Sequence, residues 1–194
     1  IYGPGGTMLG LMLGVGLAFL MEFANDLVRT PRDVSRHLSA QLLGVIPNKD
    51  EDKQTKKLDS CEIVQKAPYS IISESYRKLR TNLKLIRSQL DSRTLLITSP
   101  MPGDGKTSVA VNLSMTLVAE DKKVLLLDAN FWKPKLHKNL CYEFEEDKNK
   151  DKDKNEFGLS TLLVGLCGYE EVVRSSGIEG LDVIDAGIMP SNPA

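Results

Sequence analysis

The stretch Thr98-Ser99-Pro100-Met101-Pro102-Gly103-Asp104-Gly105-Lys106-Thr107-Ser108 lies between two apolar segments, and with them it decides the fold. Residues 93–98 have the apolar pattern of a buried strand, and residues 109–119 have the periodicity of a helix. Gly103 and Gly105 let successive backbone N–H groups turn toward phosphate oxygens. Lys106 can reach the β- and γ-phosphates, and the Thr107 hydroxyl is placed to bind Mg²⁺. The stretch therefore predicts a phosphate-binding loop for a nucleoside triphosphate.

The loop departs from the general pattern GxxxxGK[ST] at its first glycine, where Pro100 stands. The alternative interpretation is a plain strand-to-helix turn that carries a surface lysine. The apolar flanks favour the phosphate loop, because its mechanism requires a strand, a loop and a helix in that order. The part of the loop that contacts phosphate is intact, and we expect the nucleotide-binding residues to be Pro102, Gly103, Asp104, Gly105, Lys106, Thr107 and Ser108.

Length and composition set the limits of what the chain can be. With 194 residues, 41% of them hydrophobic, it can hold one globular α/β domain and an accessory segment. The net charge of −1 does not indicate a nucleic-acid-binding protein. The three cysteines are far apart in sequence, which indicates neither a disulfide framework nor a zinc site. Because the chain begins at Ile1 and stops where a new element is due, we expect it to be part of a longer protein.

Residues 1–27 are predicted to form a transmembrane helix. No charged residue occurs from Gly5 to Met21, and a helix extended to Phe23 is about 28 Å long, which fits the hydrocarbon core. A buried soluble helix is the alternative, but the glycines here weaken a soluble helix and permit close helix contacts in lipid. Three arginines follow the span, so the positive-inside rule predicts that the residues after about 27 are cytoplasmic, where ATP is found. They are Arg29, Arg32 and Arg36.

The remaining chain divides into a juxtamembrane adaptor and linker, 28–57, and a P-loop domain, 58–194. Residues 48–57 are nearly all charged or polar and read as a flexible linker. In the domain we predict helices over 70–89 and 158–165, strands over 122–128 and 181–186, and a solvated insertion over 143–156. This order predicts an α/β fold with a parallel sheet flanked by helices. Lys106 and Asp128 then lie at the same sheet edge.

Several features occur in one order along the chain. They are the apolar N-terminal helix, an arginine-rich adaptor ending in Leu43-Gly44-Val45-Ile46-Pro47, the Glu74-x-x-Arg77-x-x-Arg80-Thr81-Asn82 helix, the phosphate loop, the strand ending at Asp128 and the Gly187-x-x-Pro190-x-Asn192-Pro193 loop. The ordered set resembles the bacterial tyrosine kinases of polysaccharide export, also described as polysaccharide co-polymerases or chain-length determinant proteins. The resemblance covers nearly the whole chain.

The resemblance implies an ATP- and Mg²⁺-dependent protein-tyrosine autokinase of the bacterial inner membrane. Lys106 and Asp128 match its catalytic positions, and Thr107 and Asp128 match its Mg²⁺ positions. Glu74, Arg77 and Arg80 match a helix that the family uses for ring-like self-association, and their spacing puts them on one helix flank. The further partners implied are the polysaccharide polymerase and export machinery and a protein-tyrosine phosphatase.

Two departures from the family leave other functions open. Where the family shows Asp-x-Asp-x-Arg, this chain has Asp128-Ala129-Asn130-Phe131-Trp132, so a carboxylate and an arginine are replaced. A second hypothesis is therefore a catalytically degenerate regulatory subunit of the same export system. A third is a partitioning or Min-type ATPase, although such proteins carry a lysine where Met101 stands. Because the family's Walker B strand and tyrosine cluster are not in these 194 residues, we expect the chain as given to be inactive as a kinase.

Overall fold

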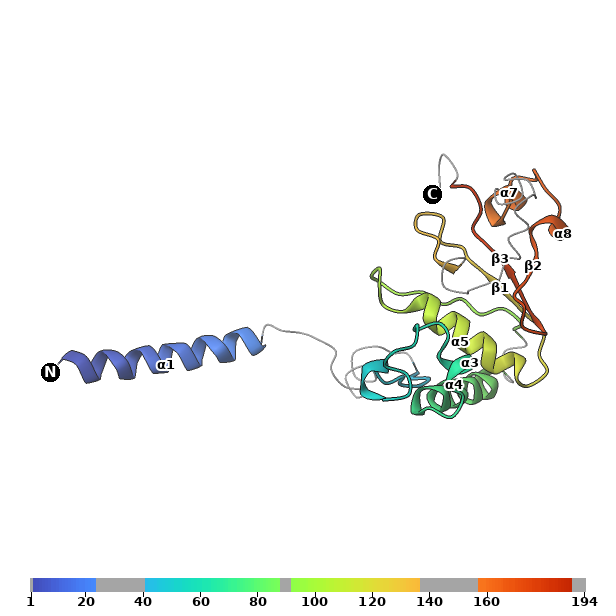
Figure 1. Cartoon of the computed structure of the whole chain (residues 1–194). Coiled ribbons are helices and arrows are strands. Elements are labelled where there is room, and N and C mark those ends of the chain that lie inside the picture. The colour runs from blue at the N-terminus through green and yellow to red at the C-terminus, as the bar shows by residue number, and fades with distance from the viewer. Residues whose placement is uncertain (1, 24–40, 88–91, 137–156, 190–194) are drawn as a thin grey trace. The chain divides into compact units, whose positions relative to one another are not determined.

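The structure is a computed structural model that describes residues 2–23, 41–87, 92–136 and 157–189 (Figure 1). The chain forms two units, Ile1–Leu42 and Leu43–Ala194. The elements are α1 (Tyr2–Phe23), η1 (Lys49–Glu51), α3 (Ile63–Lys66), α4 (Ile71–Arg87), α5 (Lys106–Val118), β1 (Val124–Leu127), α7 (Leu159–Leu163), α8 (Tyr169–Val172), β2 (Arg174–Ser175) and β3 (Leu181–Ile184).

The first unit contains the predicted N-terminal helix. The large apolar side chains of α1 from Met8 to Met21 are exposed, and Leu11 and Met12 are examples at 72% and 78%. Within the described part of the chain, we find no helix that combines the length and the hydropathy needed to cross a membrane. The predicted transmembrane span is therefore not confirmed. In the adaptor, Thr30 followed by Pro31 predicts a short helix that ends at about Ser39. This segment and the adaptor arginines lie outside the described residues.

The second unit is built on a small mixed sheet. Its strand order is β1-β3-β2, with β1 and β3 parallel and β2 antiparallel to β3. Val124 pairs with Leu181 and Leu127 pairs with Ile184, so these two strands end at the same sheet edge. The predicted strands over 122–128 and 181–186 are thus confirmed, as is their parallel arrangement.

The predicted strand over 93–98 is wrong, because these residues are irregular in structure. Leu95 and Leu96 are 55% and 82% exposed, so the apolar run is not buried between two layers as a central strand would be. Ile97 alone from this run packs against the core. The apolar run 42–46, which ends at Pro47, also has the pattern of a strand. These residues are irregular too, although Leu43 and Ile46 pack against the core.

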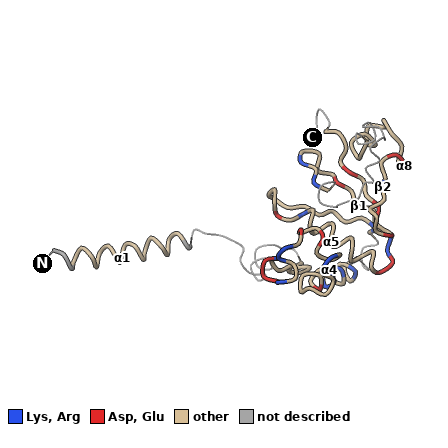
Figure 2. Tube along the Cα trace, viewed as in Figure 1, with Lys and Arg blue, Asp and Glu red and all other residues tan. Residues whose placement is uncertain are grey.

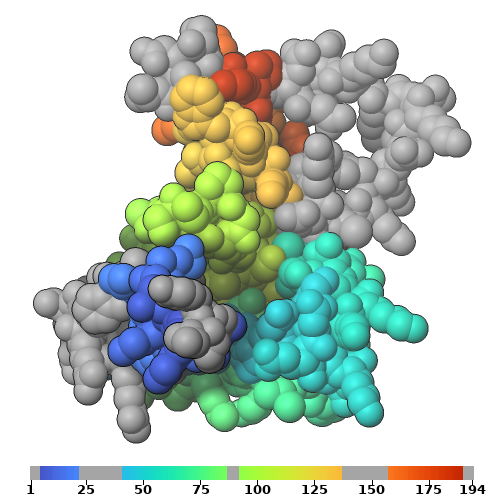
Figure 3. Space-filling model, turned by 90° about the vertical axis from the view of Figure 1, so that its left-hand side faces the viewer, coloured from blue at the N-terminus to red at the C-terminus, as the bar shows by residue number. Residues whose placement is uncertain are grey.

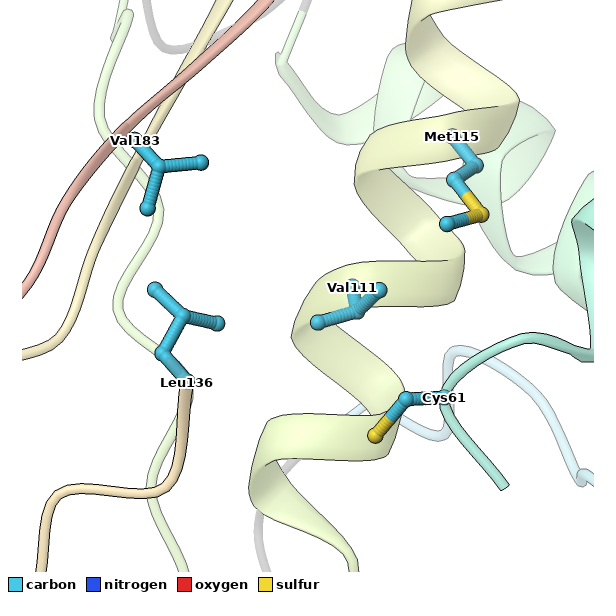
Figure 4. Close-up of a cluster of buried hydrophobic side chains, with 5 residues drawn as sticks. All are labelled: Cys61, Val111, Met115, Leu136 and Val183. Carbon is cyan, nitrogen blue, oxygen red and sulfur yellow. The ribbon is translucent and has the colours of Figure 1, made fainter. Parts of the chain in front are cut away.

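Helix α5 lies between the sheet and the α3–α4 layer (Figure 1). On the sheet side, a buried cluster joins five residues from four parts of the chain, shown in Figure 4: Cys61, Val111, Met115, Leu136 and Val183. On the other side, Leu113 packs with Ile63, Ile72 and Tyr76. Because α5 contacts both layers, it is buried around its circumference from Val111 to Thr116. Its N-terminus lies near the end of β1 (Figure 1).

The segment predicted as a flexible linker is folded. Asn48 caps η1 by accepting a hydrogen bond from the Asp50 N–H, and Lys49 donates its Nζ hydrogen to the Leu58 carbonyl at 3.0 Å. The Thr55 side chain is fully buried and donates to the Lys49 carbonyl at 2.8 Å. Most of the charged side chains of this segment are exposed, around a backbone that forms several internal hydrogen bonds. A high content of charge therefore did not signify disorder here.

Candidate nucleotide-binding site

The phosphate loop turns sharply into α5 through its two glycines. Gly103 has φ of 98° and Gly105 has φ of 85°, a backbone region that L-residues with a Cβ adopt at a cost. Gly105 is the N-cap of α5, so Lys106 is the first helical residue and Thr107 the second. The N–H groups at the start of a helix have no intrahelical partner and carry the positive end of the helix dipole. The loop therefore has the geometry of an anion-binding site.

The Lys106 ammonium lies against its own loop. It donates to Ser99 Oγ at 2.6 Å and to the Met101 carbonyl at 2.9 Å. Ser99 Oγ also contacts the Met101 carbonyl at 3.1 Å, and the Met101 N–H donates to Asp104 Oδ2 at 3.0 Å. The side chains of the loop thus hold its backbone and the lysine in one compact arrangement. The sequence predicted Lys106 and Asp104 as site residues but not Ser99. Nothing in the residues around Ser99 indicates that its hydroxyl binds the Lys106 ammonium.

Asp128 follows β1 directly, and its backbone N–H donates to the Ile184 carbonyl at 3.0 Å, which extends the pairing with β3. Its carboxylate accepts three backbone N–H groups, from Asn130 on Oδ1 and from Lys135 and Leu136 on Oδ2. The aspartate is therefore held in one orientation by the loop that follows it.

The start of α5 and the end of β1 lie at the same end of this helix–strand pair (Figure 1). In the face that Figure 3 shows, the lime-green segment that contains the phosphate loop adjoins the amber segment that follows β1. The predicted common edge of Lys106 and Asp128 agrees with this arrangement, which follows from a helix running antiparallel to the strand that it covers.

A buried asparagine fixes the other side of α5. Asn112 is fully buried, and its Nδ2 donates to the Ser60 carbonyl at 2.7 Å and to the Ser108 carbonyl at 2.8 Å. Its Oδ1 accepts the Val64 N–H at 2.9 Å. Beside it, the Cys61 thiol lies 3.5 Å from Ser108 Oγ, and burial raises the pKa of that thiol. The segment that leads into α3 is thereby joined to the first turns of α5, the helix that follows the phosphate loop.

Tyr76 on α4 also belongs to this buried region. Its side chain is 3% exposed, and burial raises its pKa to about 12, with the Cys61 thiol adding to the rise and a hydrogen bond with Asn112 opposing it. The phenol is therefore neutral in the folded protein throughout the physiological range. Tyr76 has a structural part in the core, and burial keeps it away from solvent.

Charged residues lie along α4 (Figure 2). Glu74 and Arg77 form an exposed ion pair at 3.0 Å. Arg80 is different, because it is only 15% exposed and donates to the Thr116 carbonyl at 2.6 Å and to Glu120 at 3.0 Å. A shallow hollow of about 510 Å³ is lined by Glu74, Arg77, Lys78, Arg80, Thr81 and Asn82. The three predicted self-association residues thus share one flank, but Arg80 also joins α4 to the last turn of α5.

The donor set fits Mg²⁺ held together with a nucleotide. Among the described residues, no three His, Cys, Asp or Glu side chains form a group that could hold a metal by themselves. Mg²⁺ usually binds one or two protein oxygens, with phosphate oxygens and water completing the octahedron. Three of the roughly four acceptor positions on the Asp128 carboxylate are taken by N–H groups, so one on Oδ1 remains. That oxygen and the Thr107 hydroxyl would hold the ion.

A glycine-rich loop that opens a helix, beside the carboxyl end of a parallel strand with an aspartate at its end, is the arrangement found in P-loop domains. No family model matches the chain. It is 29% identical over 197 residues to the putative tyrosine-protein kinase EpsB of Ralstonia solanacearum, covering 98% of this chain and 25% of that protein. It is 35% identical over 132 residues to the tyrosine-protein kinase YwqD of Bacillus subtilis, covering 68% of this chain and 51% of that protein.

Solved structures give the same assignment. The kinase domain of the Escherichia coli tyrosine kinase ETK superposes with a TM-score of 0.68 at 29% identity, over 86% of this chain and 62% of that one. The chimeric protein CapA2B2 gives 0.62 at 31% identity, over 84% and 63%. The chain belongs to the family of bacterial tyrosine kinases. It spans about a quarter of the length of EpsB and about half that of YwqD.

Proposed function

We propose that the protein is an ATP-binding protein-tyrosine autokinase that acts in the assembly and export of a bacterial exopolysaccharide or capsule. The observation that carries the proposal is the position of Lys106, at the first turn of α5 in a glycine-rich loop beside the carboxyl end of β1. The names of the relatives support the tyrosine-kinase activity, and EpsB and CapB are among them. These names favour a tyrosine kinase over a partitioning or Min-type ATPase.

In this proposal the loop N–H groups and the start of α5 bind the phosphates of ATP, and Lys106 leaves its contacts with Ser99 and Met101 to bind the β- and γ-phosphates. The remaining Oδ1 position of Asp128 accepts one further group, which is either Mg²⁺ or the hydroxyl of the acceptor tyrosine. Mg²⁺, when bound by Thr107, Asp128 and the nucleotide, supplies positive charge that neutralises the phosphates. Positioning and charge neutralisation account for most of the catalysis of phosphoryl transfer.

Self-association and membrane anchoring are further parts of the proposal. Glu74 is exposed and Arg77 is half-buried in the lining of the hollow on α4, where they can pair with the charges of a second copy in a ring. The exposed apolar side chains of α1 support anchoring in the bacterial inner membrane, with the residues after about 27 in the cytoplasm. The partners we propose are the polysaccharide polymerase and export machinery and a protein-tyrosine phosphatase.

A catalytically degenerate regulatory subunit is the second candidate function. The observation that favours it is the pair of residues Asn130 and Trp132, which replace a carboxylate and an arginine of the family pattern. In this case nucleotide binding controls assembly and no phosphate is transferred.

Transfer of γ-labelled phosphate from Mg-ATP to tyrosine in the complete protein separates the two candidates. An autokinase gives labelled tyrosine in the parent protein and none in Lys106→Met, while Lys84→Met, an exposed lysine on α4, keeps the label. Absence of label in a parent protein that binds ATP would overturn the kinase proposal and leave the regulatory subunit.

A further inference from the structure

The loop after β1 is closed by Asn130. Its Nδ2 donates to the Lys133 carbonyl at 3.0 Å, and its Oδ1 accepts the Lys133 N–H at 3.2 Å. The carboxamide therefore makes a donor and an acceptor contact with the same residue. A carboxylate has acceptors only, so an aspartate at position 130 could receive the N–H but would place an oxygen against the Lys133 carbonyl oxygen. Asparagine is the residue type that closes this turn in both directions.

The closed turn determines which N–H groups reach Asp128. The Asn130 N–H donates to Oδ1 at 3.0 Å, and the N–H groups of Lys135 and Leu136 donate to Oδ2 at 3.0 and 3.1 Å. The last two come from the far side of the turn, beyond Lys133. They reach the carboxylate because the chain reverses between residues 130 and 133.

The far end of the loop is attached to the core. Leu136 is 3% exposed and packs with Val111 and Met115 of α5 and with Val183 of β3 (Figure 4). The loop thus starts at the end of β1 and finishes against the helix whose first turn forms the phosphate loop. The conformation of the loop therefore determines the position of the Asp128 carboxylate with respect to α5.

We propose that Asn130 is a positioning residue for Asp128: it closes the turn that directs three N–H groups onto the carboxylate and leaves one Oδ1 position for a cation or a hydroxyl. The proposal rests on the proposed function for what Asp128 acts on. It also explains why asparagine occupies position 130, where the family pattern has a second aspartate. The replacement of the second carboxylate is then a structural feature of the loop.

Hydrogen exchange of single backbone amides tests the proposal in the full chain, and needs no activity. We compare the parent with Asn130→Asp and with Asn130→Ala. The expected result is that the Lys135 and Leu136 amides exchange about two- to tenfold faster in both variants, the factor that follows from weakening one hydrogen bond. The matched control is Asn48→Asp, because the Asn48 side chain only accepts a hydrogen bond at the cap of η1 and a carboxylate can do the same. Exchange of the amides in α5 reports on the fold as a whole and should not change.

Unchanged exchange at Lys135 and Leu136 in Asn130→Asp would overturn the proposal. So would a rise in phosphate transfer in Asn130→Asp with unchanged exchange, because Asn130 would then be a lost catalytic carboxylate. If the complete protein transfers no phosphate but the two amides respond as expected, the proposed kinase activity fails and the positioning of Asp128 stands.

Discussion

Replacement of Asn112 by alanine should destabilise the second unit strongly. The side chain is fully buried and has three hydrogen bonds with backbone groups, at 2.7, 2.8 and 2.9 Å. Two of these satisfy groups outside the helix, the Ser60 carbonyl and the Val64 N–H. The Val64 N–H lies in the first turn of α3, where no helical carbonyl is available to accept it.

The magnitude follows from the groups that the alanine leaves behind. A buried backbone donor or acceptor without a partner costs about 1–3 kcal/mol, so two of them cost about 2–6 kcal/mol. The Ser108 carbonyl loses one contact but remains within α5. Because a domain has a total stability of about 5–15 kcal/mol, this loss is a large part of it.

Urea unfolding followed by tryptophan fluorescence and circular dichroism measures the effect. The matched control is Ser114→Ala on the same helix, because the Ser114 hydroxyl has one hydrogen bond, to the Ala110 carbonyl at 2.8 Å, and its removal orphans no group outside the helix. We expect a loss of under about 1 kcal/mol in the control. Equal losses in the two variants, or a loss under about 1 kcal/mol in Asn112→Ala, would refute the reasoning.

Three further changes have expected outcomes. The pKa of Tyr76 is raised to about 12 in the folded state from an ordinary value of about 10, so its contribution to stability is complete below pH 10 and is lost as the pH rises to 12. The loss in the free energy of unfolding is about 2–3 kcal/mol. Between pH 10 and 12 the urea midpoint should therefore fall less steeply with pH in Tyr76→Phe than in the parent. The same pH dependence in both proteins would contradict the raised pKa of Tyr76. Arg80→Met removes the contacts with Thr116 and Glu120 and should lower the free energy of unfolding in urea by about 1–3 kcal/mol. Lys84→Met, which changes an exposed residue, should lower it by under about 0.5 kcal/mol. Similar losses in the two variants would show that the link between α4 and α5 is weak. Gly105→Ala should cost about 1–2 kcal/mol, because φ is 85°, and should weaken nucleotide binding in a calorimetric titration; an unchanged unfolding midpoint would contradict the strain.

The parts of the fold that the sequence predicts well are those with a strong local signal. Helix α5 was predicted from the apolar run after the loop, and β1 and β3 from short apolar runs with turn residues beside them. The phosphate loop was predicted because its glycines and lysine have a fixed order that the mechanism requires. Each of these signals lies within a dozen residues of chain.

The features that the sequence did not predict depend on contacts between distant segments. The apolar run at 93–98 has the pattern of a strand, yet strand formation requires a partner in a sheet, and Leu96 is 82% exposed. Thr55 is buried within a charged segment because that segment folds around it. Asn112 is a polar residue in an apolar helix, and its partners are 48 and 52 residues away. Only the tertiary structure brings these groups together.

Binding of Mg-ATP to the chain tests the central claim most directly, which is that the loop before α5 is a phosphate-binding loop. Calorimetric titration of the parent and of Lys106→Met with Mg-ATP, Mg-ADP and AMP should give binding of the first two to the parent. In Lys106→Met the affinity for Mg-ATP should be about 10- to 100-fold weaker, because a charge-assisted hydrogen bond with phosphate is lost. Equal affinity of the two proteins for Mg-ATP, or binding of AMP as tight as that of Mg-ATP, would contradict the account.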